Sequence, residues 1–312
     1  MTRKIILLAV FAVVNVGKAL GCDICGCGVG SYYLGILPEF NQRFAGIRYQ
    51  FKTMETHLSP SGARTPLSQD ETYQSMEVWG GFNLGSRWRL MGILPYNFNQ
   101  RTVPSQNQQG AKSGLGDAVV LGYYKIFEQT KTTEAFQFFN HSLWVGTGIK
   151  APTGQYDSSE ESTVLSGSLN SFQLGTGSTD LMLLAAYDAR LMDFGMNFNT
   201  SFKANSPNSS DYRYGNKLTG NLLIYRKISL GIDRRIAPNL GFMYESQRKD
   251  ERYGRFYVNQ SGGTVFSGVV GVEVNVGKFS FGGNYQSLLH QNLAQGRAKA
   301  GNRLMFHFSM GF

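Results

Sequence analysis

The chain ends with the stretch Arg303-Leu304-Met305-Phe306-His307-Phe308-Ser309-Met310-Gly311-Phe312. Every second side chain of an extended segment points to the same side. The apolar residues of the stretch therefore share one face: Leu304, Phe306, Phe308, Met310 and Phe312. The opposite face is polar or small, with Met305 as the exception: Arg303, His307, Ser309 and Gly311. Alternation with a period of two predicts a β-strand with one apolar face and one face in a polar environment.

The aromatic residue at the end of this strand has a functional implication. It resembles the C-terminal signal of bacterial outer-membrane β-barrel proteins, which the barrel-assembly machinery reads. The resemblance implies that Phe312 binds this machinery. It also implies that the protein lies in the cell outer membrane of a Gram-negative bacterium, in contact with outer-membrane lipid and glycolipid.

The composition favours a membrane barrel over other classes of protein. Charged residues make up 16% of the chain, whereas soluble domains carry about 25%. A mean hydropathy of −0.22 is too low for a bundle of membrane helices. The 16 Tyr and 22 Phe residues are too many aromatics for a disordered chain. A barrel fits these values, because only alternate residues of each strand face lipid.

The N-terminus has the features of a secretory signal peptide over residues 1–21. Arg3 and Lys4 form a positive start, residues 5–16 are apolar, and Ala19-Leu20-Gly21 offers small residues for cleavage. The apolar run is shorter than the roughly 20 residues that a membrane helix needs. Removal of the signal takes three basic residues with it and lowers the formal charge from +9 to +6. An exported protein does not meet nucleic acid, so anionic solutes or acidic glycolipid are the expected partners.

Residues 44–312 are predicted to form one all-β domain, a single antiparallel transmembrane β-barrel of about 12 strands. The strands are expected to begin near Ala45, Tyr73, Trp88, Gly116, Phe136, Ser178, Phe194, Leu218, Asn239, Thr264, Phe279 and Asn302. Alternation predicts these lipid-facing residues: Phe194, Phe198, Phe202, Val270, Val272, Phe279, Phe281, Phe306 and Phe308. The segments around Leu90 and Leu121 do not reveal which face is which.

The connections between the predicted strands alternate between long and short. The long ones cover residues 55–70, 99–115, 154–177, 205–216, 247–263 and 291–301. The short ones cover residues 85–86, 129–133, 189–193, 228–236 and 277–278. Outer-membrane barrels have long extracellular loops and short periplasmic turns. With both termini in the periplasm the first connection must be long, as it is here.

Glycine-rich motifs recur where predicted strands meet long loops. They cover residues 113–117 (SGLGD), 148–154 (GIKAPTG), 174–180 (LGTGSTD) and 212–216 (YRYGN). In their order they resemble the outer-membrane transporter family described for the meta-pathway of phenol degradation, distant relatives of fatty-acid-type channels for hydrophobic solutes. The resemblance spans about residues 46–312 and implies a barrel that transports small solutes. Two roles remain open for the glycines: bends and close strand approach at the rim, or direct contact with solute.

The segment between the signal and the barrel, residues 22–43, holds the three cysteines of the chain, Cys22, Cys25 and Cys27. Three interpretations stay open: a disulfide in the oxidising periplasm, a soft metal ion held by thiolates, or lipidation of Cys22. Three thiolates without a nearby histidine do not complete a zinc site. No other cofactor is expected. The apolar residues 32–40 form either a short plug in the periplasmic mouth or an extended tether.

The polar faces of the strands are expected to line the lumen. The candidate path residues are Arg48, Lys52, Glu77, Asn197, Asn199, Lys203, Glu245, Glu273, Asn275, Arg303 and His307. Charges inside a narrow barrel must pair or form hydrogen bonds, because isolated buried charges are costly. We therefore expect most of these residues to form a structural network and the remainder to set selectivity along a path.

Two functions remain open from the sequence. The first is passive transport of small solutes, including hydrophobic or aromatic ones, and the second is a non-conducting scaffold, sensor or metal-linked partner that acts through residues 22–27. Barrel size does not decide between them, because barrels of about eight strands are filled by side chains and those of 16 to 18 leave a water channel. We do not expect an enzyme. His141 and Ser142 are adjacent and point to opposite faces, and the chain has no Gly-x-Ser-x-Gly motif.

Overall fold

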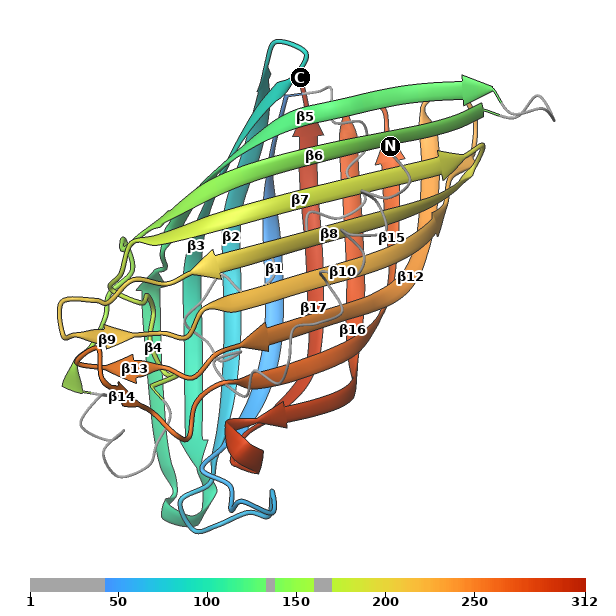
Figure 1. Ribbon diagram of the computed structural model, residues 1–312. Coiled ribbons are helices and arrows are strands. Elements are labelled where there is room, and N and C mark those ends of the chain that lie inside the picture. Colours follow the sequence, from blue (N-terminus) through green and yellow to red (C-terminus); the bar gives the residue numbers. More distant parts are fainter. Residues whose placement is uncertain (1–42, 133–137, 160–169) are drawn as a thin grey trace, which may run out of the picture.

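The computed structural model describes residues 43–132, 138–159 and 170–312, which form a closed antiparallel barrel of 12 strands. The barrel strands are β1 (Phe44–Thr56), β2 (Gln69–Leu84), β3 (Trp88–Val103), β5 (Ala118–Thr132), β6 (Phe138–Ala151), β7 (Asp180–Leu191), β8 (Phe194–Ala204), β10 (Lys217–Arg226), β12 (Arg234–Gln247), β15 (Gly263–Val276), β16 (Phe279–Leu293) and β17 (Lys299–Gly311). Each strand pairs with the next along the barrel, and β1 pairs with β17 to close it (Figure 1). The predicted fold class and strand number are confirmed.

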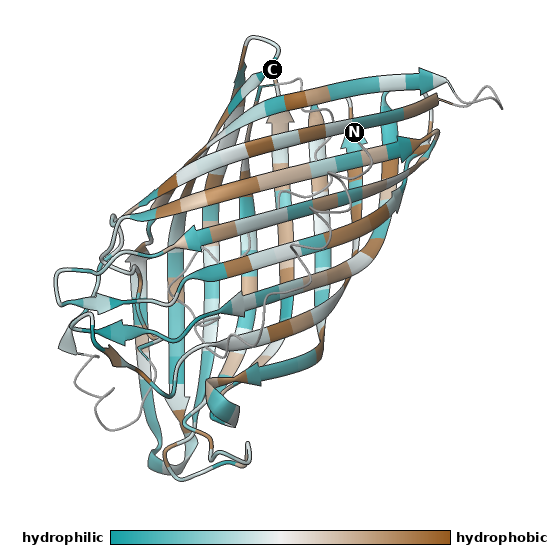
Figure 2. Cartoon of the chain, in the orientation of Figure 1, coloured by the Kyte–Doolittle hydropathy of each residue, from teal (hydrophilic) through white to brown (hydrophobic). Residues whose placement is uncertain are grey.

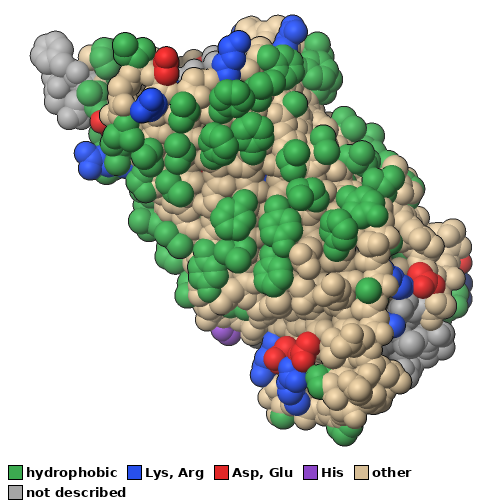
Figure 3. Space-filling view, turned by 180° about the vertical axis from the view of Figure 1, so that it is seen from behind, with side chains coloured by type: hydrophobic (Ala, Val, Ile, Leu, Met, Phe, Trp, Pro, Cys, Tyr) green, Lys and Arg blue, Asp and Glu red, His purple; other side chains and the backbone are tan. Residues whose placement is uncertain are grey.

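The outer surface of the barrel is apolar. Every side chain that alternation assigned to lipid is exposed, from Phe194 at 57% to Phe202 and Phe308 at 38%. Hydropathy alternates along the strands in Figure 2. Figure 3 shows apolar side chains spread over the wall, with charged side chains gathered near the two ends. This is the distribution expected of a wall that lipid surrounds.

The connections alternate in length as predicted. Gly85 and Gly277 have φ angles of 67° and 56° and allow the chain to reverse within a few residues at the end where β1 begins. The long loops lie at the opposite end, which is the extracellular end of an outer-membrane barrel. Within the described part of the chain, the helical segments are too short to traverse a membrane.

One predicted loop is a strand hairpin instead. Residues 99–115 were expected to form an irregular connection, but β3 continues to Val103, and the chain returns through η1 (Pro104–Gln106) and β4 (Gln108–Leu115). Asn107 has a left-handed φ of 49°, which reverses the chain between the two strands. The hairpin carries polar side chains on both faces, so its strands lack the apolar alternation by which the other strands were recognised.

Short strands also form in two of the other long loops. β9 (Tyr212–Arg213), β13 (Glu251–Arg252) and β14 (Phe256–Tyr257) form a separate three-stranded sheet. At the other end, β11 (Ile228–Ser229) pairs with the start of β12. The pairing of β13 with β9 joins the loop before β10 to the loop before β15 at the extracellular mouth (Figure 1).

The segments around Leu90 in β3 and Leu121 in β5, whose faces the sequence did not distinguish, are apolar on both sides. Leu121 is fully buried and points inward, whereas Leu90 points outward. Leu121 belongs to a cluster of buried side chains on the lumen face of β1 to β7: Phe44, Trp79, Met91, Ile93, Val119, Leu121, Tyr123, Trp144, Met182, Leu184 and Ala186. One side of the barrel interior is therefore apolar, which hydropathy alternation alone could not reveal.

Candidate functional site

The structure places every predicted path residue on the inward face of its strand. The residues come from β1, β2, β8, β12, β15 and β17, and several are almost fully buried, including Arg48 and Glu245 at 1%. Residues 22–42, with the three cysteines and the predicted plug, lie outside the described residues. The metal, disulfide and lipid interpretations of that segment therefore stay predictions.

Several buried charges of the lumen form ion pairs. Arg48 Nε donates to Glu77 Oε2 at 2.6 Å, and Gln50 Nε2 donates to Glu77 Oε1 at 2.7 Å. Glu245 lies between Lys217 at 2.8 Å and Arg303 at 2.5 Å. A buried ion without a partner costs several kcal/mol, which explains why these groups meet in pairs and triads.

Other predicted path residues make separate contacts: Asn275 accepts a hydrogen bond from Ser280, and the Lys52 ammonium lies over the Tyr73 ring. Glu273 and His307 are 3.0 Å apart between their carboxylate and ring nitrogen atoms. Asn199 Nδ2 donates to Asn221 Oδ1 at 3.2 Å and also to Asn197. The sequence identified the members of the network from their alternation, but the pairing depends on strand register.

A loop segment that the sequence placed outside the barrel folds into its mouth. Residues 170–176 are buried, with Gln173 at 0% and Ser171 at 1% exposed. Inward-facing side chains of β3 hold the backbone of this segment, since Asn97 Nδ2 donates to the Leu174 carbonyl at 2.9 Å and Asn99 Nδ2 to the Gln173 carbonyl at 2.8 Å. We call residues 170–178 the inner loop.

The inner loop also contacts the opposite side of the mouth. Tyr214, which follows β9, donates its hydroxyl to the Asn170 carbonyl at 3.3 Å. On the side of β2 and β3, the Phe172 ring packs against the guanidinium of Arg101, whose Cζ atom lies 4.6 Å from the ring centroid. Ser171 Oγ donates to the buried Glu71 carboxylate at 3.2 Å. The inner loop thus spans the extracellular mouth and is attached on both sides.

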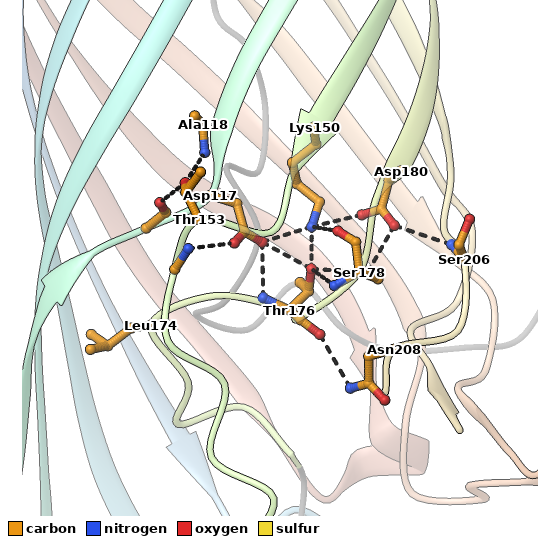
Figure 4. A network of polar contacts seen from close by, with 12 residues as sticks. Asp117, Ala118, Lys150, Thr153, Leu174, Thr176, Ser178, Asp180, Ser206 and Asn208 are labelled. Carbon is orange, nitrogen blue, oxygen red and sulfur yellow. Dashed lines mark hydrogen bonds and ion pairs between the residues drawn. The ribbon is translucent and has the colours of Figure 1, made fainter. Parts of the chain in front are cut away.

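Three glycine-rich motifs converge on one buried charge cluster at the base of the inner loop (Figure 4). Lys150 Nζ lies 2.7 Å from Asp117 Oδ2 and 2.9 Å from Asp180 Oδ2, and all three side chains are at most 1% exposed. The Lys150 ammonium also donates to the Ser178 carbonyl at 3.0 Å and to Thr176 Oγ1. We call Asp117, Lys150, Thr176, Ser178 and Asp180 the latch.

The latch binds the backbone as well as the side chains of the loop. Asp117 Oδ2 accepts from the Thr176 amide at 2.9 Å, and Asp117 Oδ1 accepts from the Gly154 amide at 3.0 Å. An added Cβ on Gly175 would lie 2.5 Å from Asp117 Oδ1 and 2.7 Å from Gly154. The glycine at position 175 is therefore required by the close approach of two loop segments, which supports the first of the two roles that the sequence left open.

Strand order could have revealed the latch. Asp117 directly precedes β5, Lys150 lies next to the end of β6, and Asp180 begins β7. These three strands are neighbours, and the register pairs Lys150 with Asp180 and Ala118 with Ala151. The fourth motif has a separate role, since Tyr212 Oη and the Gly215 amide both donate to the Asp250 carboxylate and join β9 to the next loop.

Comparison with known proteins shows that the fold of this chain is similar to that of solved outer-membrane barrels. No family model and no curated protein matches the chain. The crystal structure of an outer-membrane channel from Pseudomonas putida F1 is similar, with 15% identity, a TM-score of 0.57, and coverage of 91% of this chain and 100% of that one. The β domain of the Bordetella autotransporter BrkA gives 13% identity and a TM-score of 0.47 over 87% and 100% of the two chains.

A monoaromatic hydrocarbon channel, TodX in a deletion variant, covers 95% of this chain and 97% of its own, at 10% identity and a TM-score of 0.33. The last two scores are too low to support an argument. The first establishes the architecture alone: this chain has an outer-membrane β-barrel fold.

Proposed function

We propose that the protein is a passive channel for small solutes in the outer membrane of a Gram-negative bacterium. The observation that carries the proposal is the inner loop, which crosses the extracellular mouth and is held by the buried latch. A barrel of about twelve strands lies between side-chain-filled and water-filled barrels. A loop built into the mouth then sets the width of the remaining path, whereas a barrel that serves only as an anchor does not need one.

The lining of the lumen supports solutes with an apolar part. Buried aromatic and aliphatic side chains, among them Trp79, Met91, Leu121 and Trp144, cover the inner face of β1 to β7. The charged groups of the opposite side are engaged in ion pairs such as Glu245 with Lys217 and Arg303. A path with one apolar side suits hydrophobic or aromatic small molecules better than strongly hydrated ions.

Solute flux into liposomes tests this proposal. The purified full-length chain is reconstituted, and uptake of a small sugar such as arabinose is compared with uptake by empty liposomes. We expect flux above the empty-liposome level. Flux that stays at that level for arabinose, for KCl and for an aromatic solute such as phenyl glucoside would rule out transport and leave the scaffold function through residues 22–27 as the better explanation.

A further inference from the structure

Several polar atoms of the lumen wall have no hydrogen-bond partner among the described residues. They belong to side chains that are at most 8% exposed and that face inward: Trp79 Nε1, Asn239 Oδ1, Asn284 Nδ2, Gln286 Oε1 and His307 Nδ1. A buried polar group without a partner costs roughly 1–3 kcal/mol. Native proteins leave few such groups, and each one calls for an explanation.

Three of these side chains are amides that lie together. Strand register places Asn239 of β12 opposite Gly271 of β15, and Gly271 opposite Asn284 of β16. A Cβ on Gly271 would lie 2.8 Å from the Gly283 carbonyl oxygen, 2.9 Å from Asn239 Oδ1 and 3.0 Å from Asn284 Cβ, so the two amides approach each other closely across this glycine. Gln286 Nε2 reaches Asn284 Oδ1 at 3.3 Å.

The remaining two atoms continue the row toward the periplasmic end. His307 pairs in register with Gly282, two residues from Asn284 on β16 in the direction of the periplasmic turn. The Trp79 and His307 rings meet edge to face, with centroids 5.7 Å apart. Acceptors and donors without partners therefore follow one another from the middle of the lumen to its periplasmic part.

The surroundings of the amides are apolar and their charged neighbours are occupied. Leu223, Tyr225, Met243, Val269 and Met305 form a buried cluster on β10, β12, β15 and β17, which include β12 of Asn239 and the two neighbours of β16. The nearby Glu245 carboxylate is paired with Lys217 and Arg303, and the Glu273 carboxylate is paired with His307. The groups that remain for a ligand are therefore neutral donors and acceptors beside apolar side chains.

We propose that Asn239, Asn284 and Gln286, which we call the amide station, bind a small uncharged solute that has both a hydrogen-bonding group and an apolar part. A primary amide is the best match, because it offers both a donor and an acceptor to side-chain amides. The inference rests on the proposed channel function and adds a solute class to it. Weak sites in series allow a solute to enter and also to leave.

Current block in planar lipid bilayers tests the amide station. KCl conductance of the full-length protein is titrated with three probes of nearly equal size: benzamide, acetophenone, which lacks the N–H donors, and benzoate, which is charged. We expect benzamide to block at a concentration about five-fold lower than either of the other two, as for one or two net hydrogen bonds. The Asn284→Leu and Asn239→Leu variants are expected to lose this preference.

The Gln291→Leu variant is a matched control, because Gln291 is an amide of β16 whose donor and acceptor are both already bonded to the Ala300 backbone. It is expected to keep the preference for benzamide. Folding of each variant is checked by its heat-dependent gel migration. Equal block by the three probes, or an equal loss of preference in Gln291→Leu, would show that the lumen conducts without selecting amides. Either result would overturn the amide station but leave the channel function intact.

A protein that conducts no KCl and also shows no solute flux into liposomes would overturn the proposed channel function instead. Calorimetry of benzamide with the detergent-solubilised protein then tests whether the amide station binds this probe. Binding that Asn284→Leu abolishes would support the station without transport. Absence of binding would overturn it as well.

Discussion

At the scale of single residues, Lys150 of the latch is a fully buried charge that pairs with two buried carboxylates. Lys150 is fully buried between Asp117 and Asp180, so its removal leaves two buried carboxylates without a counter-charge. Breaking such a buried cluster costs about 3–5 kcal/mol, whereas exposed ion pairs contribute little. The latch is therefore the place where one substitution should release the inner loop.

We expect Lys150→Met to make the inner loop accessible to protease. Limited proteolysis of the folded protein should cleave the variant near residues 170–178 faster than the wild type. Arg64→Gln serves as the matched control, because Arg64 also bridges two carboxylates, those of Glu55 and Asp70, but is half exposed. Equal cleavage of wild type and Lys150→Met would contradict the assigned role of the latch.

A histidine at the extracellular rim should make stability depend on pH. Burial, aided by the nearby Arg101, lowers the pKa of His57 from its ordinary value of 6.5. Below that value the unfolded chain binds a proton that the folded chain binds more weakly, so stability falls as the pH decreases. The heat-denaturation midpoint should therefore drop between about pH 7.5 and about pH 5.

The His57→Asn variant is expected to show a smaller drop over the same pH range. Asparagine tolerates the left-handed backbone at this position, where φ is 58°, better than most residues. An unchanged pH dependence in the variant would show that other groups control the acid sensitivity of the protein.

At the scale of strands and loops, prediction from the sequence succeeded where lipid imposes a pattern. Residues such as Phe198, Val270 and Phe306 are exposed and alternate with inward-facing polar ones, as expected of strands with one face toward hydrocarbon and the other toward the lumen. The pattern failed for β4, which is polar on both faces, and around Leu121, where the lumen itself is apolar.

The inner loop could not be predicted for a different reason. Asn97 and Asn99 hold it through backbone carbonyls, which any loop sequence can offer. The motifs that contain Asp117, Lys150 and Asp180 were recognised, but their meeting depends on the three-dimensional path of the loop. Alternation with Phe279, Phe281 and Tyr285 places Asn284 and Gln286 on the polar face of their strand, but the sequence could not show which of their amide atoms lack partners, because that depends on strand register.

Close packing between loop segments gives a prediction at this scale. Gly175→Ala should destabilise the inner loop by about 1–3 kcal/mol, as overpacking does, because the new Cβ meets Asp117 and the backbone of Gly154 within 2.7 Å. Gly92→Ala is the control, since its Cβ meets nothing within 4 Å. The readout is the temperature at which the folded band disappears from a gel, and equal midpoints would refute the packing argument.

At the scale of the whole molecule, the barrel depends on closure between its first and last strands. β1 and β17 pair from Phe44 with Gly311 to Glu55 with Lys299, and the Phe312 amide donates to the Arg43 carbonyl at 2.9 Å. An open strand edge in lipid would leave backbone groups without hydrogen bonds. Assembly must therefore bring both ends of the barrel together.

We expect Phe312→Asp to lower the amount of folded protein in the outer membrane more than it lowers synthesis. The Phe312 side chain is 66% exposed beside the lipid-facing residues of β17, where a carboxylate is unfavourable. Phe312→Tyr keeps the aromatic ring and should assemble normally. Membrane fractions with wild-type levels of the Asp variant would argue against the role of this residue in assembly.

The central claim is that the protein conducts and that the inner loop, held by the latch, limits conduction. Single-channel recording of the full-length protein in planar bilayers tests both parts together, with Lys150→Met as the released form and Arg64→Gln as its control. We predict a small, steady conductance for the wild type and for Arg64→Gln, and a larger or fluctuating conductance for Lys150→Met. Absence of current, or the same conductance in all three proteins, would contradict the claim.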